Sequence, residues 1–439
     1  MGKHTTPGSL ITAFERVALF SDIFDDRPGQ LYLSLLKALH ARDERDVPKL
    51  YGQFFKAVSD IYPLVDAEGG EDIWPTHLAR RIAESNNAFM VSAERLRFGD
   101  IPAPLRGQAQ MDLSDIQQHR LFGPDELAEA IADSTGRTAV SLSGLKIDAP
   151  PVAKMLLNLK NWSTATESLA QTVRSQGAGI FGQYRAFRWI STAQELRGVE
   201  SPDPITLDQL WEYDWQKERL VRNTRKLLHG YPANNALLYG DRGTGKSSSV
   251  KALVNKFYKD GLRLVEVHKE NLVDFPDILR ILRPRAQKFI LYIDDLSFEE
   301  DDSQFKALKA VLEGGIETRP TNVALYATSN RRNLVKERFS DRQSDGGEDA
   351  DGEEDVHMMD SYQEKLSLAD RFGIRLPYST PDKAAYLNIV HNLAIQAGLV
   401  IPQNELDAQA MQWQESRSGR SARQFIDWMV GERGLEQGD

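Results

Sequence analysis

The stretch that decides the fold of this chain reads Gly240-Asp241-Arg242-Gly243-Thr244-Gly245-Lys246-Ser247. It matches the pattern G-x-x-x-x-G-K-[ST], in which glycines bring backbone N–H groups close to a phosphate chain. We expect Lys246 to reach the β- and γ-phosphates and the Ser247 hydroxyl to ligate Mg²⁺. The alternative is a glycine turn that fits the pattern by chance. An apolar run at residues 235–239 and a helical run at 248–254 flank the loop, and this context favours phosphate binding.

Composition limits the class of protein. The chain has 439 residues, enough for two or three domains, and no cysteine, which excludes disulfides, thiol nucleophiles and cysteine metal sites. Its longest apolar runs, such as residues 289–293, are too short to span a bilayer, and residues 1–9 lack the apolar core of a signal peptide. We therefore expect a cytoplasmic protein. The net charge of −10 argues against general nucleic-acid binding but not against a local basic surface.

The first part of the chain predicts helices. Between residues 10 and 200 apolar residues recur at helical spacing, interrupted by short turns, and no catalytic constellation is visible. This half is expected to serve recognition, assembly or regulation. Residues 181–189 mix aromatic residues with arginines, which is typical either of a surface that stacks on bases or of an amphipathic helix. We favour the amphipathic helix, packed by its aromatic side. A linker at residues 198–204 is expected to separate this region from the nucleotide-binding part.

A second strong signal follows the loop. Residues 289–293 form an apolar run that ends in Asp294 and Asp295, the Walker B pattern. Such a strand is buried in a parallel sheet, with its carboxyl end opening onto a ligand crevice. Asp294 is then placed to hold Mg²⁺ through water, and Asp295 to act as the general base or to polarise the attacking water. The alternative is that both aspartates only form a turn and cap the next helix.

A third polar strand end completes the predicted site. The apolar run at residues 322–327 ends in Thr328-Ser329-Asn330. The amide of Asn330 is expected to orient water against the γ-phosphate, although the same residues alone would only begin a loop. A turn and helix at residues 205–228, just before the phosphate loop, are where an adenine pocket would lie.

The remaining segments predict an insert and a helical unit. Residues 341–360 are strongly acidic, and we interpret them as a solvated, disordered loop. A tether or autoinhibitory arm is the alternative, whereas the ligand spacing of a calcium loop is absent. After a short strand at residues 374–376, Thr380-Pro381-Asp382 predicts a helix start, and helices at 404–413 and 421–430 follow.

These elements, in this order, resemble the AAA+ superfamily of oligomeric ATPases over residues 206–430. The resemblance implies that residues 240–247 are Walker A, that Asp294 and Asp295 are Walker B, and that Asn330 is sensor 1. It also implies that Arg371, in an Asp-Arg-Phe-Gly element, is an arginine finger for the neighbouring subunit. Arg423 corresponds to the sensor 2 arginine of the lid, unless both arginines only form surface ion pairs.

The resemblance also implies a fold and a domain plan. We expect an α/β fold, a P-loop NTPase parallel sheet flanked by helices with a small C-terminal helical lid, preceded by an all-α N-terminal domain. The predicted boundaries are residues 1–200 for the N-terminal domain, 201–377 for the ATPase core with its acidic insert, and 378–439 for the lid. The predicted nucleotide contacts are residues 240–247, Ser248 and Arg423; the predicted metal ligands are Ser247 and Asp294.

A narrower resemblance involves three runs, at residues 240–247, 294–299 and 327–332. They are similar to a bacterial family of predicted AAA+ ATPases, the domain of unknown function 815. One position departs from the wider superfamily, in which glutamate usually follows the Walker B aspartate, whereas this chain has Asp295. Helicase-loader-like members share the aspartate pair, so the departure makes ATP binding the firmer expectation and leaves room for slow hydrolysis.

The expected function is therefore Mg²⁺-dependent hydrolysis of ATP to ADP and phosphate. Because an arginine finger acts between subunits, the protein is expected to form a ring or open helical oligomer that remodels or assembles a macromolecular partner bound by its N-terminal helices. The alternative is a nucleotide-gated binding module of the loader or initiator type, associated with DNA, with little turnover. A GTPase is disfavoured because no Asn-Lys-x-Asp motif follows the loop, and a kinase because no acceptor site is visible.

Overall fold

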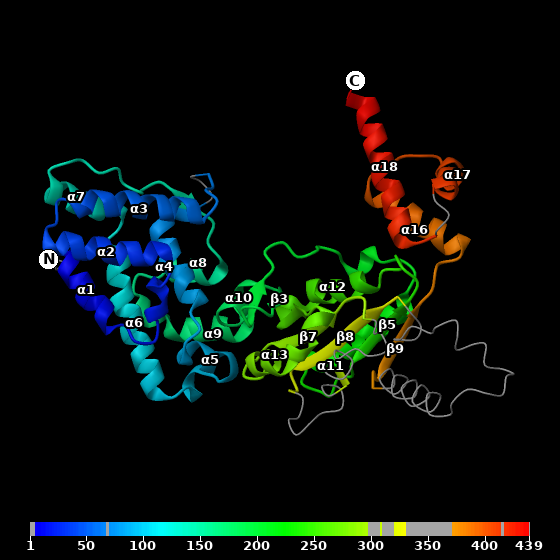
Figure 1. The fold of residues 1–439 in the computed structure, drawn as a ribbon, viewed down its shortest axis with the longest axis horizontal. Helices are drawn as coiled ribbons and strands as arrows, with labels where there is room; N and C mark the ends of the chain where they lie inside the picture. The colour runs from blue at the N-terminus through cyan, green and yellow to red at the C-terminus, as the bar shows by residue number, and fades with distance from the viewer. Residues whose placement is uncertain are drawn as a thin grey trace, which may run out of the picture. The chain divides into compact units, whose positions relative to one another are not determined.

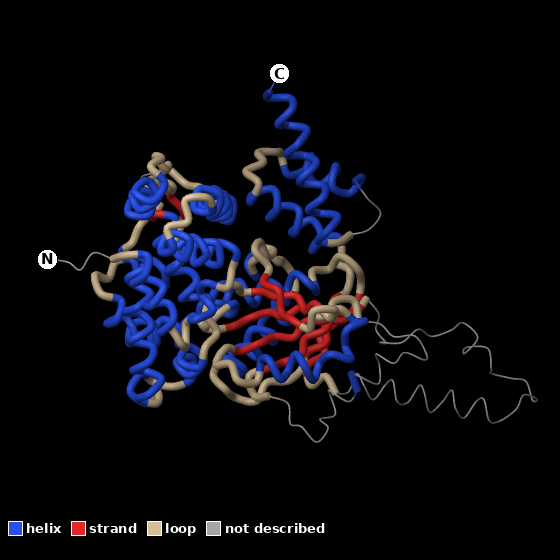
Figure 2. The backbone as a smooth tube through the Cα atoms, turned by 60° about the vertical axis from the view of Figure 1, so that its left-hand side comes forward, coloured by secondary structure: helices blue, strands red, loops and turns tan. Residues whose placement is uncertain are grey.

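The computed structural model describes residues 5–66, 70–296, 308–309, 320–330, 371–413 and 417–438. The chain divides into two compact units, Met1–Gln183 and Tyr184–Asp439 (Figures 1 and 2). Within the described ranges, no helix is long and apolar enough to cross a membrane. The acidic segment at 341–360 lies outside the described residues, as do the last residues of the runs at 294–299 and 327–332.

The first unit is built of helices, as expected. They are α1 (Pro7–Arg16), α2 (Arg27–Ala41), α3 (Asp46–Ile61), α4 (Ile73–Glu84), α5 (Ala88–Arg95), α6 (Ala103–Leu121), α7 (Pro124–Thr135), α8 (Pro151–Leu157), α9 (Thr166–Gln176) and α10 (Ile180–Gln183). Two-residue strands β1 (Glu71–Asp72) and β2 (Lys146–Ile147) pair antiparallel. Capping residues start several helices; the Asp26 side chain, for example, accepts a hydrogen bond from the Gly29 N–H at the start of α2.

The core of the first unit is aromatic. Tyr32 packs against Trp74 with ring centroids 4.5 Å apart, and Phe54 lies 5.1 Å from Trp74. These rings come from α2, α3 and α4, whose buried positions recur at intervals of three and four residues. The helices therefore close around one shared apolar interior.

The second unit contains a seven-stranded sheet. Its strands are β3 (Ala186–Ile190), β4 (Glu195–Gly198), β5 (Ala236–Gly240), β6 (Leu262–Glu266), β7 (Lys288–Ile293), β8 (Val323–Ser329) and β9 (Ile374–Tyr378). Their spatial order is β4-β3-β6-β7-β8-β5-β9, and every neighbouring pair is parallel except β3 and β4. Strands β7 and β8 are buried almost throughout because helices cover both faces of a parallel sheet. The helices α11 (Asp214–Leu228), α12 (Lys246–Phe257) and α13 (Phe275–Leu282) accompany it.

The helix expected over residues 181–189 is wrong beyond Gln183. Residues 186–190 form β3, and residues 184–200, which the sequence placed with the helical half, contribute the β3–β4 hairpin to the sheet. Phe187 and Trp189 are buried while Arg188 is exposed, the alternation of a strand. Over so short a run, the spacing of the aromatic residues and arginines fits the period of a helix and that of a strand. The segment forms a strand because its backbone pairs with β6.

A small helical lid follows the sheet. It consists of α16 (Lys383–Gln396), α17 (Gln403–Trp413) and α18 (Gly419–Gly438), which share a core of their own that includes Val390 and Phe425. The Asp382 side chain caps α16 by accepting a hydrogen bond from the Ala385 N–H, so the helix begins at the end of the predicted run and is capped by the last residue of that run, Asp382, and not by Thr380. The α/β fold with an N-terminal helical region and a C-terminal lid is confirmed.

Candidate nucleotide-binding site

The phosphate loop joins the carboxyl end of β5 to α12, at the edge of the sheet where the parallel strands end. Gly240 has a φ of +130°, and a Cβ there would lie 2.1 Å from the Tyr378 carbonyl oxygen, so only glycine fits. A Cβ on Gly243, with φ at +76°, would meet the Ser418 hydroxyl of the lid at 2.9 Å. Helix α12 begins at Lys246 without a side-chain cap. Its first backbone N–H groups therefore point toward the loop, an arrangement suited to an anion.

Lys246 is held inside this loop. Its side-chain ammonium donates hydrogen bonds to the carbonyl oxygens of Gly240, at 3.0 Å, and of Asp241, at 2.6 Å. Burial lowers the pKa of Lys246, whereas the nearby carboxylates of Asp241, Asp295 and Asp294 act in the opposite direction. The two hydrogen bonds thus hold the side chain in a confined position at the phosphate end of the site.

Asp294, directly after β7, gathers hydroxyl groups from two other elements. Its Oδ1 accepts hydrogen bonds from the Ser247 hydroxyl on α12, at 2.8 Å, and from the Thr328 hydroxyl on β8, at 2.5 Å. Burial raises the pKa of Asp294, but hydrogen bonds, first that of Thr328, outweigh burial and hold this pKa below its usual value. Asp294 is therefore ionised at neutral pH.

Asp295 has a backbone conformation that turns it away from the strand. Its φ is +52°, in the left-handed region that aspartate tolerates at a cost of about 1 kcal/mol. The backbone N–H donates to the Thr328 hydroxyl at 3.0 Å, and the carboxylate oxygen Oδ1 accepts a hydrogen bond from the Asn330 amide at 2.7 Å. The two residues that the sequence predicted for water activation are thus in direct contact.

The oxygen atoms around Asp294 fit a hard cation. Mg²⁺ prefers oxygen ligands, and the Ser247 hydroxyl and Asp294 carboxylate offer them side by side. The side chain of Tyr292 is fully buried in the strand below, close to Asp294. Burial, and next to it the Asp294 charge, raise the pKa of Tyr292, so its hydroxyl stays protonated. The chemistry of the oxygen donors of Ser247 and Asp294 therefore fits Mg²⁺.

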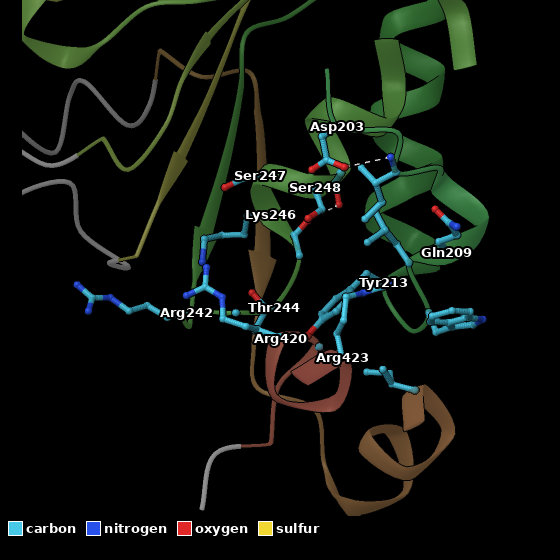
Figure 3. Close-up of a pocket in the computed structure, with 18 of the residues that line it drawn as sticks. Asp203, Gln209, Tyr213, Arg242, Thr244, Lys246, Ser247, Ser248, Arg420 and Arg423 are labelled. Carbon is cyan, nitrogen blue, oxygen red and sulfur yellow. Dashed lines mark hydrogen bonds between the residues drawn. The ribbon is translucent and has the colours of Figure 1, made fainter. Parts of the chain in front are cut away.

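These residues line one end of a cleft of about 810 Å³ (Figure 3). The walls comprise the loop residues Arg242, Gly243, Thr244, Gly245, Lys246, Ser247 and Ser248, the strand ends Asp294, Asp295, Thr328 and Asn330, and, facing them, Asp203, Ile205, Gln209, Leu210, Trp211 and Tyr213. The segment that was expected to hold an adenine therefore supplies this second wall. Ile389, Leu393, Arg420, Arg423 and Asp427 of the lid close the remaining side.

Most of the predicted site residues converge on this cleft, but three do not line it. Gly240 lies beneath the loop against Tyr378, and the Asp241 side chain turns to Thr380. Arg371 is exposed and precedes β9. Because β9 is parallel to β5, the start of β9 lies at the amino ends of the strands, whereas the phosphate loop follows the carboxyl end of β5. Within its own subunit, Arg371 is therefore not a residue of this cleft.

Two contributors were missed from the sequence. Thr328 bridges Asp294 and the Asp295 backbone, and its position two residues before Asn330, on the strand paired with β7, was the available signal. Arg420 is the second residue of α18, and its backbone N–H donates to the Gly243 carbonyl oxygen at 3.2 Å. Its positive charge acts to lower the pKa of Lys246, so its guanidinium faces the phosphate end of the cleft, as Figure 3 also shows.

The sheet order, the glycine loop leading into α12 and the paired carboxylates define a P-loop nucleotide-binding fold of the AAA+ type. The model of a family described as "Protein of unknown function (DUF815)" matches residues 182–433, more than half of the chain. The chain belongs to this family. No curated protein matches it by sequence.

Several solved structures are similar to part of the chain. The Thermotoga maritima RuvB Holliday junction branch migration motor is 14% identical, with 53% of this chain and 67% of RuvB covered and a TM-score of 0.36. A point mutant of the same RuvB is 15% identical over 53% and 68% of the two chains, with a TM-score of 0.37. The FIGL-1 AAA domain in complex with ADP is 15% identical over 54% and 76%, with a TM-score of 0.36. The fold assignment therefore rests on the strand order and loop described above.

Proposed function

We propose that this chain binds ATP with Mg²⁺ and hydrolyses it to ADP and phosphate, as an oligomer that remodels or assembles a macromolecular partner. The observation that carries the proposal is the contact between Asp295 and Asn330 in the same cleft as Lys246 and the Ser247–Asp294 pair. A site that only binds a nucleotide needs the lysine and the hydroxyl. Hydrolysis needs in addition a carboxylate that can accept a proton from water, and the Asn330 amide holds the Asp295 carboxylate at the phosphate end of the cleft.

Each residue then has a role. Lys246 exchanges its two carbonyl partners for phosphate oxygens, and the uncapped start of α12 binds the same phosphates. Ser247 and Asp294 hold Mg²⁺, which when bound spreads the charge of the β- and γ-phosphates. Asp295 accepts a proton from the attacking water, while Asn330 holds the carboxylate in position.

The oligomer is part of the proposal because of Arg371. This arginine is exposed and lies away from its own cleft, near the amino ends of the parallel strands. A guanidinium there is suited to reach the γ-phosphate bound by a neighbouring copy and to stabilise the charge of the transition state. The site of each copy would be complete only in the assembly.

The test is phosphate release from ATP, measured across protein concentration together with the mass in solution. The set comprises wild type, Lys246→Ala, Asp295→Asn and Arg371→Ala. Arg197→Ala, at an exposed arginine of β4, and Asp277→Asn, at a surface aspartate paired with Arg280, are the matched controls. We expect turnover that rises with assembly, that is lost in the first three variants and that is unchanged in the controls. Turnover independent of mass, or retained in Asp295→Asn, would contradict the proposal.

A surface on α11 favours the second candidate, a nucleotide-gated module that binds nucleic acid. Trp215, Arg219, Arg222 and Lys226 recur at intervals of four, three and four residues, and all four are exposed. This basic stripe, as we call these four residues, places the Arg219 guanidinium 5.3 Å from the centroid of a Trp215 ring. Cations beside an exposed indole suit a single strand, whose phosphates pair with the cations and whose bases stack on the ring.

Binding of a single-stranded oligonucleotide, with and without ATP and over a series of salt concentrations, separates the two candidates. If the chain is such a module, affinity depends on ATP, and replacing Arg219, Arg222 and Lys226 by glutamine lowers the salt slope by about three. The matched control replaces Arg42, Arg45 and Lys49, three exposed cations of the first unit. Equal affinity of both triple variants would remove the support for a nucleic-acid partner at this stripe.

A further inference from the structure

The loop between β9 and α16 connects the sheet to the lid, and its first two residues are hydrogen-bonded to Tyr213, which lines the nucleotide cleft, and to Asp241 of the phosphate loop. The Ser379 carbonyl oxygen accepts a hydrogen bond from the Tyr213 hydroxyl at 2.9 Å. Thr380 donates two hydrogen bonds, from its backbone N–H and from its hydroxyl, to Asp241 Oδ2, each at 2.7 Å. We call residues 379 and 380 the hinge. Movement of the lid about the hinge therefore acts on the contacts that the hinge makes with Tyr213 and Asp241.

Asp241 is the unusual partner among these contacts, because it belongs to the phosphate loop and yet its side chain does not line the cleft. Its backbone N–H donates to the Tyr378 carbonyl oxygen at 2.9 Å, so both the backbone and the side chain of Asp241 hold the end of β9 and the hinge. Its negative charge also acts on Lys246, which places it within electrostatic range of bound phosphates. For phosphate binding that charge is unfavourable, whereas for the hinge it strengthens two hydrogen bonds.

We propose that Asp241 is a positioning residue that couples the phosphate occupancy of the loop to the position of the lid through Thr380. The coupling rests on the nucleotide binding proposed above and adds a mechanism by which the lid responds to it. Because the Asp241 side chain does not line the cleft, Asp241 acts through the hinge and takes no part in the chemical step.

The proposed coupling uses two points of the phosphate loop, Asp241 and Gly243. The Lys246 ammonium donates hydrogen bonds to the carbonyl oxygens of Gly240 and Asp241. A phosphate that draws this ammonium toward itself removes both hydrogen bonds, and the Asp241 peptide can then reorient while its side chain remains bound to Thr380. The lid also touches the loop directly, where the Arg420 N–H donates to the Gly243 carbonyl oxygen at 3.2 Å. The lid is thus linked to two separate points of one loop, and both links are physical contacts.

Three variants of the full chain separate the positioning role from a merely structural one. Thr380→Val removes the hydroxyl but keeps the backbone N–H and the branched shape, and Thr380→Ser keeps the hydroxyl. Asp241→Asn removes the charge and keeps the size. Each is measured for ADP affinity, for phosphate release and for amide hydrogen exchange of the peptide that contains the hinge, with and without ADP.

We expect Thr380→Val to slow turnover by about three- to tenfold, with ADP affinity within about twofold of wild type, and Thr380→Ser to restore turnover. Asp241→Asn should slow turnover as well but bind ADP about two- to fivefold more tightly, since a repelling charge is lost. The double variant Asp241→Asn/Thr380→Val should be no slower than the worse single variant, because both changes weaken the same link.

Hydrogen exchange gives the readout that does not depend on turnover. In wild type, ADP should change the exchange rate of the hinge peptide by at least about threefold, and in Asp241→Asn this response should disappear. The coupling is overturned if the hinge does not respond to ADP in wild type, or if Thr380→Val and Thr380→Ser behave alike. If the hinge responds to ADP but wild type does not turn over, hydrolysis fails and the coupling stands. If no nucleotide binds, both proposals fail.

Discussion

Two buried polar side chains, one in each unit of the chain, serve opposite purposes. In the first unit the carboxylate of Asp112, fully buried on α6, accepts hydrogen bonds from the backbone N–H groups of Ala18, Leu19 and Phe20. In the second unit Lys246 is only 5% exposed, yet it lines the cleft together with Asp294. The Asp112 carboxylate is engaged by the fold itself, whereas the Lys246 ammonium lies where a ligand can reach it.

This difference indicates which residues contribute to the free energy of unfolding and which contribute to ligand affinity. A buried carboxylate that satisfies three backbone N–H groups stabilises the fold, because removing it leaves three donors without partners. A lysine bound to two loop carbonyls stabilises little, because the same ammonium is more favourably paired with phosphate. We therefore expect changes in the first unit to affect stability and changes in the cleft to affect binding. The predictions that follow can separate these two effects.

The largest effect is expected for Lys246→Ala. Loss of the ammonium should weaken ATP affinity by about 100-fold or more, because a buried charge pair with phosphate costs about 2 to 5 kcal/mol to truncate. Stability in the absence of nucleotide should change little, since burial already disfavours the charged lysine. Isothermal titration with ATP and thermal unfolding measure the two quantities. A variant that unfolds more easily but binds ATP normally would break the comparison.

Next comes Asp112→Ala, which should destabilise the first unit by about 3 kcal/mol through the unpaired N–H groups of residues 18–20. Hydrogen exchange of peptides from residues 5–183 reports this loss separately from the rest of the chain. Affinity for ATP in the folded protein should be unchanged. Asp125→Ala, at an exposed aspartate of α7 that accepts a hydrogen bond from the Ser141 hydroxyl, is the control and should leave protection intact.

A pH dependence should distinguish the units further. His119, buried among Tyr32 and Phe24, has its pKa lowered by burial from 6.5 to about 4, while Asp115 opposes the shift. The unfolded chain therefore binds the proton first. Stability from neutral His119 is complete above pH 6.5 and is lost as pH falls toward about 4, by at most about 3 kcal/mol.

Urea unfolding of wild type and His119→Phe between pH 7 and 4.5 measures this loss. The variant keeps an aromatic ring in the cluster but has no group to protonate, so its stability should fall less steeply with acid. His40→Gln, at an exposed histidine of α2, should follow wild type. Parallel slopes for wild type and His119→Phe would show that other groups cause the acid sensitivity.

The smallest effect is expected within the lid. Arg420→Ala should weaken ATP affinity more than Arg423→Ala, by about tenfold against about threefold, because the side-chain charge of Arg420 acts at the phosphate end of the cleft, where it lowers the pKa of Lys246. Both arginines line the cleft, so each variant is the matched control of the other. The reverse order would return the leading role to Arg423, which the family resemblance favours.

Local patterns predicted the phosphate end of the site because each part of it lies within a few residues of sequence. The glycine loop, Asp294 and Asp295, and Asn330 all end or follow apolar strands, and parallel strands bring their carboxyl ends to one edge. The same logic missed Thr328, although its position two residues before Asn330 was an available signal, because a hydroxyl at a strand end is weaker evidence than a carboxylate or an amide. It also misread residues 186–190, whose pattern over so few positions fits a helix and a strand equally.

By itself, the sequence determined the family, the α/β class and the identity of the loop, since glycine conformation and strand burial are encoded in single residues and short runs. Only the tertiary structure decided what surrounds the phosphates: that Arg420 faces Lys246, that Tyr213 reaches the hinge, and that Asp241 binds Thr380 rather than lining the cleft. Asp241 and Thr380 are 139 residues apart in the chain. Such contacts depend on how the lid packs against the sheet, and no local pattern contains that information.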